Sequence, residues 1–320
     1  VSDTIMAHLV GRIKVDGKEI VLDPLLRANA IHCLASFLPR LVEMLDEYDV
    51  QPVDLSLAKI CCGAEPSSDA VRMRVAERFG IWPRDDYGLG EFYGPGVASE
   101  CDAGGCLHVL SDTFITEVVD PDSGEPTPVG EMGELVLTSL HKEALPLFRY
   151  KTGDRVMALP QDCPCGMAHY RIGRVRGRIR ADDIVIPGGT VINRTYLEEV
   201  LLPVDGIGYE YVVTLAEHPK RRGLQQLCIG VEQAAEADSA GATGGDGDLA
   251  EVIARRFRTE YKYTPVVHIL PLGTVPRSWG KAKRVCSPEE YRALVQQSGR
   301  EGLGAAQSFA AQVPSDTHLD

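Results

Sequence analysis

Apolar positions between residues 36 and 90 alternate between helical spacing and short continuous runs. A helix is predicted from Ser36, a candidate N-cap, because apolar side chains follow it at intervals of three and four. The apolar run 55–62 predicts a buried strand, Ser68 opens a second helix, and a second strand ends just before Tyr87. This order of strand, helix and strand is typical of a parallel sheet that binds ligands at the carboxyl ends of its strands.

The pattern changes after residue 105. Short strands separated by turns fill 106–159 and predict a small antiparallel β subdomain, with strands at 114–119 and 133–137. Beyond residue 180 the order becomes strand, helix, strand, strand, helix, strand, the split βαβ of a small ferredoxin-like domain. Those elements are expected at 183–186, 195–202, 209–215, 225–231, 249–260 and 266–270. The predicted fold class is therefore α/β: a parallel αβ layer with a small β subdomain, followed by a ferredoxin-like α+β C-terminal domain.

The two ends of the chain show weaker patterns. Strands at 12–15 and 19–22 around Asp16-Gly17 predict a hairpin, because Asp-Gly favours a tight two-residue turn. Residues 234–248, rich in Ala, Gly and Asp, predict a flexible surface loop. The expected organisation is an unassigned segment over 1–35, a large domain over 36–177, a C-terminal α+β lid domain over 178–297 and a disordered tail over 298–320.

Composition narrows the class of protein. A chain of 320 residues with 44% hydrophobic and 25% charged residues is ordinary for a globular protein with a sizeable core. A net charge of -13 opposes binding to nucleic acid or anionic lipid, so neither partner is expected. No apolar run reaches the roughly 18 residues of a membrane span and no leader sequence is recognisable. A cytoplasmic location is expected.

Several of the nine cysteines lie close together in sequence, which suits reduced thiols or metal binding better than a disulfide framework. Cys163 and Cys165 form a compact Cys-Pro-Cys-Gly loop, and Cys101 and His108 lie upstream. These four soft or borderline ligands suit a tetrahedral structural Zn²⁺ site, whereas buried free thiols are the alternative. The reserve ligands are Cys106 and His169.

The run 86–96 gathers aromatic residues, glycines and one central carboxylate. Glycines allow close approach of the backbone to a ligand, Tyr87 can stack on a base, and Glu91 can hold a divalent cation beside phosphates. Ordinary turn chemistry also explains the Gly-Pro-Gly in this run. On these residues alone, a nucleotide loop and a structural turn both remain open.

Four further motifs accompany this run. They are Gly63-Ala64-Glu65-Pro66, Tyr150-Lys151-Thr152-Gly153-Asp154, Gly177-Arg178 with Asp182-Asp183, and the segment from Pro276 to Arg284, Pro-Arg-Ser-Trp-Gly-Lys-Ala-Lys-Arg. In this order, over roughly residues 36 to 290, the chain resembles the adenylate-forming (AMP-binding) enzymes. Within that superfamily it is most like the phenylacetate-coenzyme A ligases, so 36–177 is expected to be a partial AMP-binding domain.

The resemblance implies a reaction. Such enzymes activate a carboxylic acid with ATP and Mg²⁺ to an acyl-adenylate and pyrophosphate, then transfer the acyl group to a thiol, usually that of coenzyme A, and release AMP. It implies that Lys281 stabilises the charge that develops between carboxylate and phosphate, and that Asp154 accepts hydrogen bonds from the ribose hydroxyls. An aromatic acid such as phenylacetate is the implied substrate. Solvated surface residues and turn caps are the structural alternatives for these side chains.

The remaining binding residues are also assigned by resemblance. Gly63, Ala64, Glu65 and Pro66 match the segment that lines adenine and the acyl group, Tyr87 and Gly88 match the adenine loop, and Glu91 matches the magnesium ligand. Arginines at 171, 174, 176, 178 and 180 crowd one decapeptide, and the last four alternate as they would on one face of a strand. Of these, the resemblance assigns Arg178 to ribose or phosphate, close to an interdomain pivot at Asp182-Asp183.

The sequence departs from the family at its phosphate contacts. We recognise no Ser/Thr/Gly-rich loop ending in lysine, Gly90 replaces a hydroxyl residue, and Pro187 replaces an arginine. The first expectation is therefore an acid-thiol ligase, which is complete in itself or is completed by a homodimer partner or second chain that supplies the loop. The second is an impaired remnant or partner subunit that binds nucleotide or acyl ligand without turnover. A zinc-stapled scaffold without a small ligand is the third reading.

Overall fold

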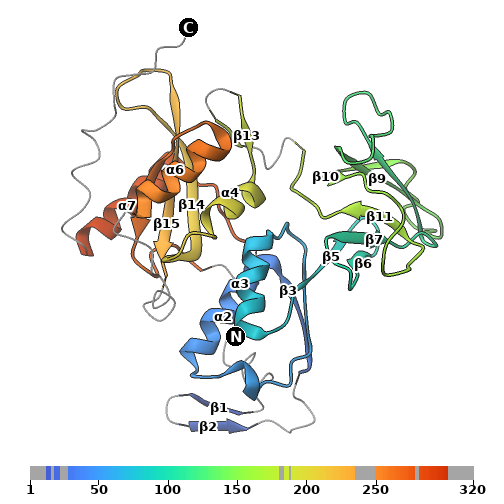
Figure 1. The fold of residues 1–320 in the computed structure, drawn as a ribbon, viewed down its shortest axis with the longest axis horizontal. Helices are drawn as coiled ribbons and strands as arrows, with labels where there is room; N and C mark the ends of the chain where they lie inside the picture. Colours follow the sequence, from blue (N-terminus) through green and yellow to red (C-terminus); the bar gives the residue numbers. More distant parts are fainter. Residues whose placement is uncertain are drawn as a thin grey trace. The chain divides into compact units, whose positions relative to one another are not determined.

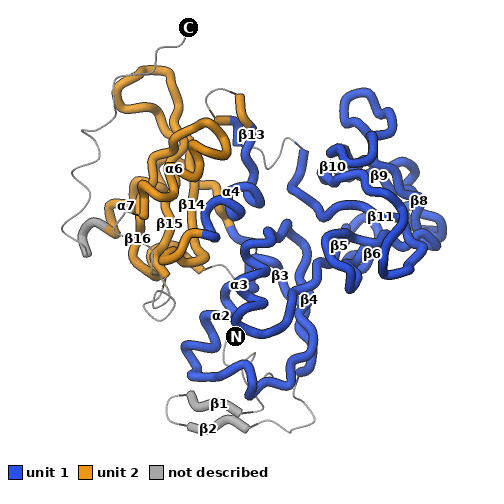
Figure 2. The backbone as a smooth tube through the Cα atoms, viewed as in Figure 1, with its two compact units in different colours: residues 1–185, 191–203, 279–282 blue, residues 186–190, 204–278, 283–320 orange. Residues whose placement is uncertain are grey.

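The protein is described here from a computed structural model, which confirms the α/β class expected from the sequence (Figure 1). Its contacts divide the chain into two compact units (Figure 2). Unit 1 comprises 1–185, 191–203 and 279–282, and unit 2 comprises 186–190, 204–278 and 283–320. The described residues are 12–15, 18–21, 28–179, 184–186, 189–234, 249–277 and 281–301. The domain boundaries expected from the sequence stay predictions.

A six-stranded mixed sheet organises unit 1, in the order β11-β7-β6-β5-β4-β3. Three neighbouring strands are parallel, as the strand and helix alternation predicts: β3 (Ala30–Leu34), β4 (Lys59–Gly63) and β5 (Arg84–Leu89). The other three join antiparallel: β6 (Gly94–Glu100), β7 (Cys106–Val109) and β11 (Tyr170–Gly173). Strand β3 lies within the segment for which the sequence offered no assignment.

Two helices connect the parallel strands and contact each other, α2 (Leu38–Glu47) and α3 (Asp69–Phe79) (Figure 1). Helix α3 begins where expected, because the Ser68 side chain accepts a hydrogen bond from the Val71 N–H at 3.3 Å. It ends at Gly80, whose φ of 69° gives the left-handed C-cap that glycine adopts without strain.

The predicted cap of α2 is wrong. A 3₁₀ turn, η2 (Ala35–Phe37), precedes the helix, and the N-cap is Phe37, without a side-chain hydrogen bond. The Ser36 hydroxyl instead donates to a carboxylate oxygen of Glu65. The Ser36 N–H donates to the same carboxylate oxygen at 3.0 Å, so a long-range contact fixes Ser36 in the turn that precedes the helix.

A second, antiparallel sheet forms the β subdomain of unit 1, in the order β10-β9-β8. Its strands are β8 (Phe114–Val119), which has the predicted bounds, β9 (Met132–Ser139) and β10 (Tyr150–Met157). One apolar core joins this sheet to the six-stranded sheet; it includes Phe92, Val97, Leu107, Leu135, Leu137, Val156 and Ile172.

Near the start of the chain, β1 (Arg12–Val15) and β2 (Lys18–Val21) pair antiparallel, which confirms the predicted hairpin. Its turn residues Asp16-Gly17 lie outside the described residues.

Unit 2 is built on the sheet β14-β15-β16. Strands β14 (Ile207–Glu217) and β15 (Gln225–Gln233) are antiparallel, and β16 (Val266–Leu270) returns parallel to β15 after α6 (Leu249–Tyr261). A last helix, α7 (Pro288–Glu301), contacts β14 and β16. It was not predicted and extends past residue 298, where the tail was expected; residues 302–320 and 235–248 lie outside the described residues.

The first half of the ferredoxin-like pattern is present in sequence order but pairs differently. The strand expected at 183–186 appears as β12 (Ile184–Val185) and pairs with β13 (Val191–Ile192), apart from the three-stranded sheet. Helix α4 (Arg194–Leu201) follows and groups by its contacts with unit 1.

Candidate functional site

Asp154 lies at an irregularity in β10. The pairing of β10 with β9 shifts register between Lys151 and Arg155, and Gly153 has a φ of 74°. Glycine tolerates this positive φ without strain. The buried alternation of β10 continues through the irregularity from Thr152 to Val156, and Asp154 lies on that inward face, only 5% exposed.

Tyr87 reaches this carboxylate from the other sheet. The sequence predicted Tyr87 just after a strand, but Tyr87 lies inside β5 and is 8% exposed. Its hydroxyl donates to Asp154 Oδ2 at 2.6 Å. Burial, then the charge of Asp154, raises the pKa of Tyr87, so its hydroxyl stays protonated and keeps donating.

Arg178 completes the cluster. It forms an isolated β-bridge with Asp154, and its Nε lies 3.4 Å from Asp154 Oδ1. The Arg178 side chain is 56% exposed, whereas that of Asp154 is 7% exposed. An ionised carboxylate offers about four acceptor sites and no donor, so Asp154 contacts hydrogen-bond donors only.

Glu91 lies in the turn between β5 and β6. The run 86–96 is thus a β-hairpin, not the single tight loop that the sequence suggested. The Tyr150 hydroxyl lies 3.4 Å from Glu91 Oε1, and burial followed by the Glu91 charge raises the pKa of Tyr150. The Lys142 ammonium donates to the carbonyls of Glu91 and Phe92, which holds the turn in place. An exposed carboxylate therefore lies close to the first residue of β10.

The glycines of two motifs have a packing role. A Cβ at Gly63 would lie 2.1 Å from the Asp86 carbonyl oxygen, and one at Gly88 would lie 1.8 Å from the Gly94 carbonyl oxygen. Both positions require glycine for close approach of neighbouring strands. Ala64, which follows Gly63, has a left-handed φ of 64°, a strained conformation for a residue with a side chain.

Glu65 is committed to protein contacts. It accepts from Ser36 and forms an ion pair with Arg194 in α4. The sequence assigned Glu65 to the pocket that lines adenine and the acyl group but missed both partners, because they are distant along the chain. Pro66 follows in the connection to α3.

The arginine repeat does not form one strand face. Strand β11 ends at Gly173, and the arginines beyond it find separate carboxylates: Arg174 is buried and pairs with Asp69, whereas Arg176 pairs with Glu199. That prediction is wrong because the backbone leaves the strand before the alternation begins. Arg180 and the predicted pivot Asp182-Asp183 lie outside the described residues, as does Pro187.

The C-terminal lysine motif separates into different environments. Arg277 pairs with Glu232, Lys283 pairs with Glu290 on the surface, and Arg284 is buried against Glu210. Lys281 is exposed, lies in no helix or strand, and belongs by its contacts to unit 1. Its neighbours 278–280 lie outside the described residues.

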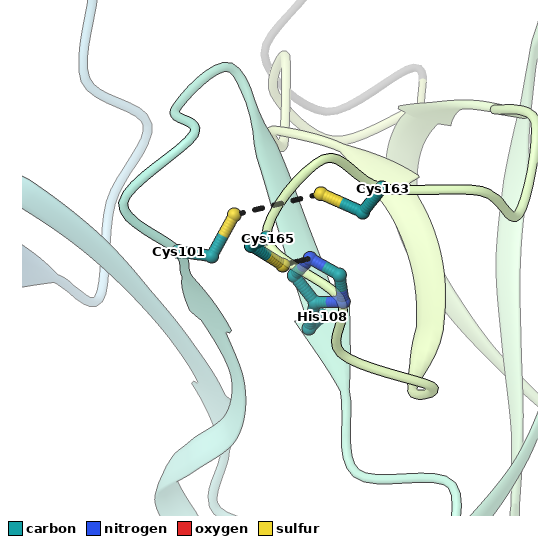
Figure 3. A group of neighbouring side chains, drawn as sticks. All are labelled: Cys101, His108, Cys163 and Cys165. Carbon is teal, nitrogen blue, oxygen red and sulfur yellow. Dashed lines mark hydrogen bonds between the residues drawn. The ribbon is translucent and has the colours of Figure 1, made fainter.

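The structure brings the four predicted metal ligands together (Figure 3). The ligand atoms of Cys101, His108, Cys163 and Cys165 all lie within 4.8 Å of one another. Cys106, a reserve ligand, has its sulfur 3.9 Å from His108 Nε2, and the other reserve, His169, accepts from the Ser111 N–H. None of the helices in the described residues is both long and apolar enough to cross a membrane.

Three residues that contact the site were not predicted from the sequence. Tyr150 opens the very motif that ends in Asp154, and its hydroxyl could have been noticed as a partner for Glu91. Lys142 and Arg194 carry no local signal, because Glu91 and Glu65, which they contact, are each more than fifty positions away.

Comparison with protein families matches residues 189–288 to the AMP-binding enzyme C-terminal domain. The chain is 37% identical over 284 residues to a phenylacetate-coenzyme A ligase of Thermus thermophilus and covers 62% of that protein. It is 34% identical to a phenylacetate-coenzyme A ligase of Pseudomonas putida and covers 59% of it. The matches cover 84% of the present chain in both cases.

Solved structures show the same fold. A 2-hydroxyisobutyryl-CoA ligase in the postadenylation state aligns with a TM-score of 0.70 and 22% identity, over 85% of this chain and 57% of that one. A benzoate CoA ligase from Burkholderia xenovorans aligns with a TM-score of 0.56 and 16% identity, over 87% of this chain and 51% of that one.

Proposed function

Because the chain belongs to the phenylacetate-coenzyme A ligase family of adenylate-forming enzymes, we propose that it activates a carboxylic acid with ATP and transfers the acyl group to coenzyme A. The carboxylate attacks the α-phosphorus of ATP, which releases pyrophosphate and gives an acyl-adenylate. The thiol of coenzyme A then attacks the acyl carbon, and AMP leaves. The chain spans about 60% of the relatives it matches.

The observation that supports this proposal most strongly is the cluster of Tyr87, Asp154 and Arg178. It combines a buried acceptor with an exposed cation that bridges to the same residue of β10. In the proposal, Asp154 accepts from the vicinal hydroxyls of the ribose and Arg178 faces ribose or phosphate oxygens. Tyr87 orients the carboxylate through its hydroxyl and is the proposed residue that stacks on the base. A buried carboxylate of fixed orientation suits a diol because it offers acceptors only.

Glu91 is the proposed ligand of Mg²⁺. Its carboxylate is of the oxygen type that this cation prefers, and it lies on an exposed turn beside Tyr150. When bound, Mg²⁺ would neutralise charge on the phosphates. The turn is held by Lys142, so the carboxylate is carried on a fixed backbone.

Lys281 is the proposed catalytic residue. Negative charge accumulates where an anionic carboxylate meets the α-phosphate, and an ammonium group directed at that charge stabilises the transition state more than it stabilises the bound substrates. Nothing in this reaction requires the thiols of the Cys/His cluster.

The names of the sequence relatives favour an aromatic acid such as phenylacetate as the substrate. Gly90 favours a second candidate, a chain that binds nucleotide or acyl ligand without turnover unless another chain supplies phosphate contacts. This residue offers no hydroxyl, and a Cβ there would meet nothing within 4 Å. The cytoplasmic location expected from the sequence remains a prediction.

Product analysis tests the proposal. The chain is incubated with ATP, Mg²⁺ and coenzyme A over a panel of aryl and alkyl acids, and acyl-coenzyme A, AMP and pyrophosphate are measured. Formation of all three in equal amounts is expected. Nucleotide binding without product would favour the second candidate, and neither binding nor product would overturn both.

A further inference from the structure

Three separate segments of unit 1 converge on a cluster of thiols that the proposed reaction does not use (Figure 3). Cys101 follows β6, His108 lies in β7, and Cys163 and Cys165 lie in the connection between β10 and β11. The two sides are about sixty residues apart in sequence. Their convergence therefore depends on the tertiary fold and not on one local loop.

Two separations between ligand atoms match those of tetrahedral coordination, and all four atoms lie within 4.8 Å of one another. With Zn–S bonds of about 2.3 Å and a Zn–N bond of about 2.05 Å, a regular tetrahedron places two sulfurs about 3.8 Å apart and a sulfur about 3.6 Å from the nitrogen. The observed separations are 3.8 Å between Cys101 Sγ and Cys163 Sγ and 3.5 Å between Cys165 Sγ and His108 Nε2. A sulfur separation of 3.8 Å is also far longer than a disulfide bond of about 2.05 Å.

The histidine is oriented for metal binding. His108 Nδ1 lies 3.4 Å from the carbonyl oxygen of His169. A carbonyl oxygen only accepts, so Nδ1 carries the proton and Nε2 keeps a lone pair directed at the sulfurs. A backbone carbonyl on the second ring nitrogen is the usual support for a metal-bound histidine.

The backbone supports the sulfurs in the same way on both sides. The Gly104 N–H donates to the Cys101 carbonyl and the Gly166 N–H to the Cys163 carbonyl, each at 3.0 Å, so each cysteine opens a turn. Both glycines have positive φ, 72° and 77°. The Met167 N–H lies 3.4 Å from Cys165 Sγ, where it stabilises a thiolate. Glycine turns therefore shape the backbone at both Cys101 and Cys163.

We propose that Cys101, His108, Cys163 and Cys165 bind one Zn²⁺ ion as a closed structural site. Three thiolates and one imidazole fill all four tetrahedral positions, so no position remains for water or substrate. Each coordinating thiol releases its proton on binding, and no electron is transferred. The ion joins the β10–β11 connection to the β6–β7 pair and thereby fixes β11, which continues toward Arg174 and Arg178.

Metal analysis of the full chain, purified with reductant and then dialysed, tests the site. About one zinc per chain is expected in the wild type. Cys163→Ser should lose most of that metal and weaken zinc affinity by at least about tenfold. Cys106→Ser is the matched control, because this buried thiol lies near His108 but outside the set; it should retain the metal.

Absence of metal from the wild type after zinc addition would overturn the proposal. The proposal would also be overturned if Cys106→Ser lost the metal and Cys163→Ser retained it. If Cys163→Ser does not fold, cobalt substitution in the wild type gives the second measurement. Intense visible bands of tetrahedral Co²⁺ with thiolate ligands are expected. Weak octahedral bands, or a Cys101–Cys163 disulfide found by mass spectrometry of the native protein, would contradict the site. Neither readout depends on ligase activity.

Discussion

Asp154 shows how the backbone places a single side chain. It lies on the buried face of β10 with Thr152 and Val156, where the carboxylate contacts Tyr87 and Arg178. Asp154→Asn keeps the shape but removes the charge and one acceptor. AMP affinity should fall about tenfold or more, since hydrogen bonds to charged groups contribute about 1.5–3 kcal/mol.

Isothermal titration with AMP measures this change. The matched control is Glu117→Gln in β8, an exposed carboxylate paired with Arg149, whose loss should leave AMP affinity nearly unchanged. Equal affinities in wild type and Asp154→Asn would remove Asp154 from the nucleotide site.

Asp85 gives a pH-dependent prediction at the same scale. Burial raises the pKa of Asp85 to about 6, with Arg72 nearby opposing the shift. The folded chain then holds this proton to higher pH than the unfolded chain, in which the pKa is about 3.9, so the free energy of unfolding falls as pH rises from about 4 to about 6.

Asp85→Asn lacks this titration. Its stability relative to the wild type should therefore increase by about 1–3 kcal/mol between pH 4 and pH 7, as measured by urea unfolding at each pH. A stability difference that is constant across this pH range would show that Asp85 does not titrate as described.

Individual residues were predictable from the sequence where few other residues of the chain have the same chemistry. The cysteines and His108 could be grouped because few other ligands compete, and their convergence is confirmed. Ser36 and Arg174 could not be placed, because a hydroxyl near a helix start and an arginine in a basic run have many local uses. Their partners, Glu65 and Asp69, are identified only by the tertiary fold.

At the scale of elements, the β5–β6 hairpin depends on one glycine. A Cβ at Gly88 would lie 1.8 Å from the Gly94 carbonyl oxygen, whereas one at Gly90 would meet nothing within 4 Å. Gly88→Ala should lower the free energy of unfolding by about 1–3 kcal/mol or more, since the strands must separate. Gly90→Ala, two residues away, is the control and should change it by less than about 0.5 kcal/mol.

Chemical denaturation of both variants measures the difference. Similar stability of Gly88→Ala and Gly90→Ala would mean that the close approach of β5 and β6 does not require glycine.

Hydrophobic periodicity was sufficient for the elements whose packing is local. Helix α3 and strand β8 follow the sequence pattern, because cap, apolar face and turn residues agree. Pairing partners were harder: β12 pairs with β13 rather than with the three-stranded sheet, and α7 was missed. Strand pairing over long separations leaves no periodic mark in sequence.

At the scale of the whole molecule, the proposed zinc ion should contribute to stability. It would cross-link segments about sixty residues apart, and binding to the folded chain alone stabilises it by mass action. Removing metal with a chelator under reducing conditions should lower the midpoint of thermal unfolding of unit 1 by several degrees, at about 2–4 °C per kcal/mol for a unit of roughly 150–250 residues. Calorimetry before and after zinc is restored measures the shift, and an unchanged midpoint in metal-free protein would show that the ion does not support the fold.

The family and the fold class could be inferred from five ordered motifs, and both are confirmed. Whether this chain alone catalyses the reaction could not be inferred, because catalysis depends on phosphate contacts that we do not recognise in its sequence. The role of Lys281 could not be inferred either, because it depends on how closely the ammonium group approaches the substrate, and the order of residues does not specify that distance.

The central claim is that this chain forms an acyl-adenylate with the help of Lys281, and carboxylate-dependent exchange of labelled pyrophosphate into ATP tests it most directly. The matched variants are Lys281→Ala and Lys283→Ala, the latter an exposed lysine paired with Glu290. Wild type and Lys283→Ala should exchange at similar rates, whereas Lys281→Ala should lose about a hundredfold or more with ATP affinity nearly unchanged. Exchange by Lys281→Ala at the wild-type rate, or no exchange by the wild type with any acid, would contradict the account.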